Sequence, residues 1–94
     1  MSFQRLQFLN LRHLPARLTA EETGWFLGFP EHQISILVGA GLLKPLGQPA
    51  SNAVKYFATT TLSELKQDAD WQSRASKEIM LYWQKKNQKK RKIA

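Results

Sequence analysis

Residues 28–45 read GFPEHQISILVGAGLLKP, and this stretch decides the expected fold. Ile34, Leu37 and Val38 recur at the i, i+3, i+4 spacing that puts apolar side chains on one face of a helix. Glycines stand on both sides of this apolar pattern, and glycine is a frequent helix stop. The stretch therefore predicts a short amphipathic helix over about residues 31–39.

A helix over about residues 20–27 is expected to precede it. Thr19 and Glu22 have the spacing of a capping box, in which each side chain accepts a hydrogen bond from the other residue's backbone N–H. Gly28 is suited to the left-handed conformation that ends a helix. The link between the two helices is the three-residue turn 28–30, and this spacing is that of a helix-turn-helix motif.

Three residues around the turn have expected structural roles. Gly24 lies inside a short helix, where glycine costs about 1 kcal/mol relative to alanine, so it predicts close approach of the second helix. Pro30 suits the first turn of the second helix, where its missing N–H costs nothing. Phe29, inside the turn, is expected to point into the core.

The chain after the second helix predicts a β-hairpin. Leu42 and Leu43 form one short apolar run, and residues 54–57 form another. Between them lies a stretch rich in glycine, proline, serine and asparagine, which is typical of a hairpin loop. A hairpin around 43–57, directly after a helix-turn-helix, would be the wing of a winged helix-turn-helix.

The two ends of the chain give weaker patterns. Residues 1–17 fit neither helical nor strand periodicity, and Pro15 prevents a helix through that position, so we expect an extended arm or short strand that docks its leucines onto the body. Thr61 and Glu64 have capping-box spacing and predict a short helix to about residue 67. Asp70 is expected to cap a last helix. Its inward positions are Trp71, Ala75, Ile79 and either Tyr82 or Trp83, and Trp71 and Trp83 are expected to cover Trp25.

The expected architecture is mainly α with a small β-hairpin, namely a winged helix-turn-helix followed by a long C-terminal helix, in a single domain over 1–94. Its divisions are an N-terminal arm at 1–17, the helix-turn-helix and wing at 18–68, the C-terminal helix at 70–84 and a basic tail at 85–94.

Composition excludes several classes of protein. The chain has 43% hydrophobic residues and ten aromatic residues, too many for a disordered chain. It has no cysteine and two histidines, so we expect no disulfide, metal or other cofactor. No apolar run approaches the ~20 residues of a membrane span, so a cytoplasmic protein without a membrane partner is expected. No catalytic motif is recognisable, and we expect that the protein is not an enzyme.

Charge is concentrated at the C-terminal end. Residues 85–92, KKNQKKRK, hold six of the fourteen basic residues, and the rest of the chain has eight basic and seven acidic residues. A nearly neutral body with a strongly basic tail is typical of a protein that contacts a polyanion, most often nucleic acid. The alternative interpretation is a tail that only keeps the protein soluble.

The stretch from Leu18 to Leu65 resembles the excisionase-like and MerR-like winged helix-turn-helix proteins over about half of the chain. The matching residues are Leu18-Thr19, Glu21-Glu22, Leu27-Gly28, Ile34, Leu37, Gly41-Leu42-Leu43, Pro45 and Lys55-Tyr56-Phe57. The resemblance implies a small transcriptional regulator or a recombination directionality factor that binds double-stranded DNA, with the second helix in the major groove and the wing beside the backbone.

The second helix departs from the family pattern because it carries no lysine or arginine. Gln33 can pair with adenine, and His32 can reach a base or a phosphate. The residues expected to contact DNA are His32, Gln33, Ser35, Lys44, Asn52, Lys55, Arg17, Lys85, Lys86, Lys89, Lys90, Arg91 and Lys92. The alternative function is a protein-interaction module, which binds a partner or its own twin through an exposed face formed by Ile36, Gly39 and Ala40.

Overall fold

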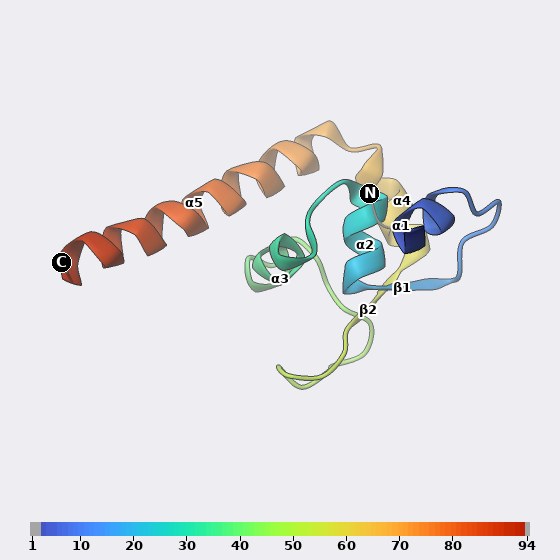
Figure 1. Ribbon diagram of the computed structural model, residues 1–94, viewed down its shortest axis with the longest axis horizontal. Helices are drawn as coiled ribbons and strands as arrows, with labels where there is room; N and C mark the ends of the chain where they lie inside the picture. The colour runs from blue at the N-terminus through green and yellow to red at the C-terminus, as the bar shows by residue number, and fades with distance from the viewer. Residues whose placement is uncertain (1–2, 94) are drawn as a thin grey trace.

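The computed structural model describes the backbone of residues 3–93 and the side chains of residues 3–88. The chain is mainly helical, with a two-stranded antiparallel sheet and a long C-terminal helix, as expected (Figure 1). The elements in chain order are α1 (Phe3–Leu9), β1 (Arg17–Thr19), α2 (Ala20–Leu27), α3 (Glu31–Gly39), β2 (Tyr56–Ala58), α4 (Thr59–Lys66) and α5 (Ala69–Ile93).

Helices α2 and α3 form at the predicted positions. The Glu22 backbone N–H donates to Thr19 Oγ1 at 3.2 Å, and the Thr19 N–H donates to Glu22 Oε1 at 2.9 Å, so the capping box is confirmed. Gly28 ends α2 in the left-handed conformation, with φ of 90°. At Gly24 an added Cβ would collide with the carbonyl oxygen of Phe29, so the predicted close approach is made by the backbone that leads into α3.

The sheet pairs β1 with β2, and it is not the predicted hairpin around 43–57. Leu18 of β1 lies opposite Phe57 of β2, and both side chains are buried. Burial of this pair favours the register in which the strand after the loop pairs with the chain before α2, and residues 42–46 form no strand with it. The wing loop (residues 44–55) projects away from the helices (Figure 1), and the Leu46 N–H donates to the Tyr56 carbonyl at 2.7 Å.

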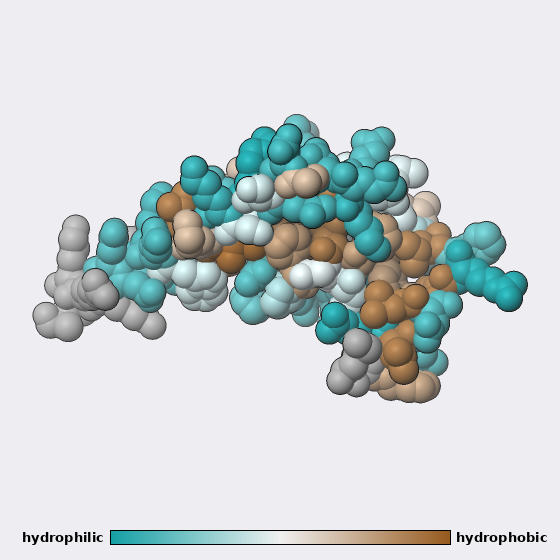
Figure 2. All heavy atoms as spheres, turned by 90° about the horizontal axis from the view of Figure 1, so that it is seen from above, coloured by the Kyte–Doolittle hydropathy of each residue, from teal (hydrophilic) through white to brown (hydrophobic). Residues whose placement is uncertain are grey.

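The N-terminal arm was predicted incorrectly as extended. Residues Phe3–Leu9 form α1, whose Phe8 is buried with its ring centroid 5.5 Å from that of Trp25. Of the leucines expected to dock, Leu14 is half-buried and packs against the core, whereas Leu6, Leu9 and Leu11 are about half exposed. Figure 2 shows apolar surface gathered over this helix. Trp25 is therefore covered by Phe8, and not by Trp71 or Trp83 as expected.

Helix α5 is longer than predicted and supplies part of the core. Trp71, Ala75 and Ile79 are buried along one face. Farther along, Tyr82 and Trp83 are 37% and 40% exposed, and the helix continues beyond the body as one rod to Ile93 (Figure 1). The predicted end at residue 84 is wrong because the basic tail is helical.

The starts of α4 and α5 differ from the predicted caps. Helix α4 begins at Thr59, two residues before Thr61, so Thr61 and Glu64 do not form a capping box. The Thr59 hydroxyl instead donates to the Pro15 carbonyl, which ties α4 to the chain before β1. The Trp71 N–H donates to Asp68 Oδ1 at 3.0 Å, so Asp68 and not Asp70 caps α5.

Candidate nucleic-acid interface

The outer face of α3 carries polar side chains, one of them acidic, and no lysine or arginine. Glu31, His32 and Ser35 are exposed, and Gln33 is half-buried. The Ser35 hydroxyl donates to the His32 carbonyl at 3.0 Å, so it is engaged within its own helix. The His32 ring lies edge-on to Trp83 of α5, with centroids 6.3 Å apart. Helix α5 therefore passes beside the N-terminal half of α3.

The apolar face suggested for a protein partner is incomplete. Ile36 is half-buried and packs against the core, so the expectation that it is exposed is wrong. The helical spacing does not explain this burial, because Ile36 lies about 100° from Leu37 around α3 and outside the stripe of Ile34, Leu37 and Val38. Gly39 and Ala40 are exposed but offer little apolar surface.

Two of the predicted cations in the body have partners within the protein. The ammonium of Lys55 donates to the carbonyls of Ser51 at 3.0 Å and Ala53 at 3.5 Å, and so closes the wing loop on itself. The Arg17 guanidinium lies 4.1 Å above the Tyr56 ring. These contacts stabilise the loop and the sheet, and they leave Lys55 and Arg17 less free to reach a phosphate.

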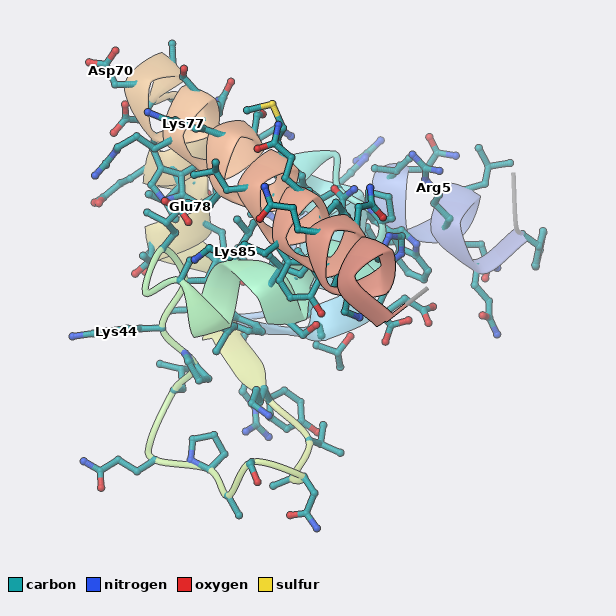
Figure 3. The ribbon with its side chains drawn as sticks, turned by 90° about the vertical axis from the view of Figure 1, so that its left-hand side faces the viewer. Arg5, Lys44, Asp70, Lys77, Glu78 and Lys85 are labelled. Carbon is teal, nitrogen blue, oxygen red and sulfur yellow. The ribbon has the colours of Figure 1, made fainter. Side chains whose placement is uncertain are left out.

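The remaining predicted residues of the wing loop face solvent. Lys44 is exposed and points away from the body (Figure 3), and Asn52 is exposed near the end of the loop. They come from separate parts of the loop and do not form a cluster with the polar residues of α3.

The basic tail is brought together by its helical conformation. Lys85 and Lys86 are exposed, and the Lys86 ammonium lies 5.1 Å from the Tyr82 ring centroid and 5.3 Å from that of Trp83. Lys89, Lys90, Arg91 and Lys92 continue the same helix, and their side chains lie outside the described residues. Positions 85, 89 and 92 are four and three residues apart, which is the spacing of one helix face.

Two basic residues of α5 were not predicted as part of the site. Arg74 and Lys77 are exposed, and Arg74 and Lys44 line the same cavity of about 550 Å³ between α5 and the chain after α3. Figure 3 shows Lys44, Lys77 and Lys85 on one side of the molecule. Helical spacing could have indicated Arg74 from the sequence. Positions 74 and 85 are eleven residues apart, which is close to three full turns and puts both on one face of the helix.

Other kinds of site have no support in the part of the chain that the structure describes. Residues 3–93 contain no helix that is long and apolar enough to cross a membrane. No group of three histidine or acidic side chains is placed to hold a metal among the described residues.

Comparison of the chain with protein families, with curated proteins and with solved structures gave no significant match.

Proposed function

We propose that the protein binds double-stranded DNA with little sequence preference, and that the C-terminal part of α5 carries most of the affinity. The observation that supports this is the continuation of α5 as one helix through the segment 85–92, which holds six cations and no acid. Cations ordered on a rod lose less conformational freedom on binding phosphate than the same cations on a flexible tail.

The dimensions of an α-helix suit this interaction. A helix with its side chains is about 10–12 Å across, and the major groove of B-DNA is about 12 Å wide. Basic helices that project from a folded body lie in this groove in several known modes of DNA recognition. The exposed residues Lys85 and Lys86 begin the cationic segment directly after Trp83 and Gln84, and Trp83 is in contact with His32 of α3.

Helix α3 has a minor role in this proposal. It carries no lysine or arginine, and Glu31 in its first turn repels phosphate. Trp83 of α5 lies against His32, so part of the surface that would face a DNA groove is already occupied. Gln33 is half-buried, which restricts its reach toward a base edge. Affinity without strong base readout is the expected result.

The regulatory role is proposed from the excisionase-like and MerR-like resemblance of residues 18–65. Small proteins of that type act as transcriptional regulators or as recombination directionality factors. A sequence-tolerant cationic helix on such a scaffold suits an architectural role, in which several copies coat or bend a DNA segment. The order of the motifs along residues 18–65 supports this role.

The proposal is tested by fluorescence anisotropy of the full chain on random duplexes at several salt concentrations. Each phosphate contact contributes about 0.9 to the slope of log affinity against log salt, so Lys85→Gln with Lys86→Gln should lower the slope by up to about 2. The matched control is Arg12→Gln with Lys66→Gln, which removes the same charge from exposed positions elsewhere and should change the slope little. Absence of binding by the full chain at about 50 mM salt would refute the proposal.

A further inference from the structure

An open groove of about 1160 Å³ lies beside α3, and His32, Ser35 and Lys55 are among the residues that line it. Its walls come from α1, the start of α2, the outer side of α3 and residues 53–55 of the wing loop. Apolar side chains line part of it, including Phe8, Trp25 and Val38. Two turns of an α-helix with side chains occupy roughly 1000 Å³, from a diameter of about 11 Å and a pitch of about 5.4 Å. The groove therefore has the size of a short helical segment.

The groove is acidic. Glu21, Glu22 and Glu31 line it, and the one lysine or arginine among its described lining residues is Lys55. The Lys55 ammonium is held by the carbonyl of Ser51, as described above. Glu21 and Glu31 are exposed, so their carboxylates remain available to a ligand. Such a surface repels phosphate and favours a cationic, partly apolar partner.

The chain itself contains a segment with this chemistry. The end of α5 combines the exposed aromatic residues Tyr82 and Trp83 with the exposed cations Lys85 and Lys86. Within one chain, Trp83 touches the edge of the groove at His32, and α5 then leaves the body as an unbroken helix, so Lys85 and Lys86 do not turn back into the groove (Figure 1). These two lysines are exposed and can reach the groove of another molecule.

We propose that this groove binds the C-terminal end of α5 from a second copy of the chain. Tyr82 of the entering helix packs on the apolar part of the groove, and Lys85 and Lys86 lie near Glu21 and Glu31. If each copy donates its helix to the other, both grooves are filled and the pair is closed by two-fold symmetry. This self-association goes beyond the proposed DNA binding and does not rest on it, although both use Lys85 and Lys86, so DNA and a second copy should compete for the end of α5.

Sedimentation velocity of the full chain at about 50 mM salt, over a range of concentrations and without nucleic acid, tests the proposal. We expect reversible dimers that weaken at least about tenfold at about 500 mM salt, where the Debye length is about 4 Å. Glu21→Lys with Glu31→Lys should weaken the dimer at least about tenfold, because like charges would then face each other. Lys85→Glu with Lys86→Glu should do the same.

The decisive experiment mixes the two charge-reversed variants, one with the altered groove and one with the altered helix. In a mixed dimer each helix meets a groove of opposite charge, so mixed dimers should form although neither variant dimerises alone. The matched control is Glu64→Lys with Asp70→Lys, which reverses two exposed acids outside the groove and should leave the dimer intact. Circular dichroism verifies that each variant is folded. If a reversed variant fails to fold, Glu21→Gln with Glu31→Gln replaces it and should also weaken the dimer.

Four results would overturn the proposal. The first is a wild-type chain that stays monomeric at low salt. The second is a folded groove variant that dimerises as strongly as the control. The third is a mixture of the two reversed variants that remains monomeric. A dimer that forms only after duplex DNA is added also contradicts it, since DNA and not the groove would then hold the copies together.

Discussion

The indole N–H of Trp71 donates a hydrogen bond to the backbone carbonyl of Leu42 at 3.0 Å. Trp71 belongs to the first turns of α5, and Leu42 lies just after α3. The two residues join the long helix to the chain segment that leaves α3, and the Trp71 ring is otherwise enclosed, with 3% of its surface exposed. The direction in which α5 projects therefore depends on this contact.

Trp71→Ala is expected to unfold the protein or nearly so. Removing a buried tryptophan costs about 3–5 kcal/mol, which is a large part of the stability of a domain this small. Trp71→Phe keeps a ring but leaves the Leu42 carbonyl without its partner, so it should cost about 1–3 kcal/mol. Thermal unfolding followed by circular dichroism measures both.

Trp83→Ala provides the comparison for Trp71, because Trp83 is 40% exposed and lies on the projecting part of α5. We expect only a small change in the thermal midpoint. If Trp71→Ala and Trp83→Ala lowered the thermal midpoint equally, α5 would have to be docked on the body along more of its length than we infer.

Gly24→Ala should destabilise the protein despite the higher helix propensity of alanine. The new Cβ would meet the Phe29 carbonyl oxygen, which belongs to the backbone and cannot rotate away. Gly39→Ala is the matched control, because it too lies in a helix and a Cβ there has open space. Gly39→Ala should raise stability by about 0.5–1 kcal/mol. Urea denaturation separates the two, and a stable Gly24→Ala variant would contradict the packing of α2 against the chain entering α3.

Thr23→Val is expected to stabilise the fold. The Thr23 side chain is fully buried, and its hydroxyl has no hydrogen-bond partner in the described part of the chain. An unsatisfied buried polar group costs about 1–3 kcal/mol, so an apolar side chain of the same shape should raise the free energy of unfolding by roughly 1 kcal/mol. Thr60→Val, at an exposed position, should change it little. A loss of stability in Thr23→Val would indicate that the hydroxyl is satisfied in solution.

The elements that could be predicted from sequence are those set by neighbouring residues. The capping box at Thr19, the stop at Gly28 and the apolar spacing of 31–39 are local patterns, and α2 and α3 form where these patterns place them. The long C-terminal helix was also predictable from the spacing of Trp71, Ala75 and Ile79, although its end was not, because the basic segment has no helix stop.

The features that sequence did not reveal depend on contacts between distant residues. The pairing of β1 with β2 is fixed by burial of Leu18 opposite Phe57, thirty-nine positions apart, and no local pattern distinguishes it from a hairpin. Helix α1 was missed because one buried residue, Phe8, docks it on Trp25. The acidic groove was missed for the same reason, since its carboxylates come from α2 and α3 and its apolar lining is completed by α1.

The measurement that most directly tests the central claim is a nuclear magnetic resonance titration of the ¹⁵N-labelled full chain with a random duplex at about 50 mM salt, where phosphate contacts are strong. At a chain concentration below that at which dimers form, we expect the largest backbone amide shifts in residues 82–93 at the end of α5, while residues 31–39 of α3 change little. The largest shifts in residues 31–39 and in the wing loop, with residues 82–93 unaffected, would contradict it.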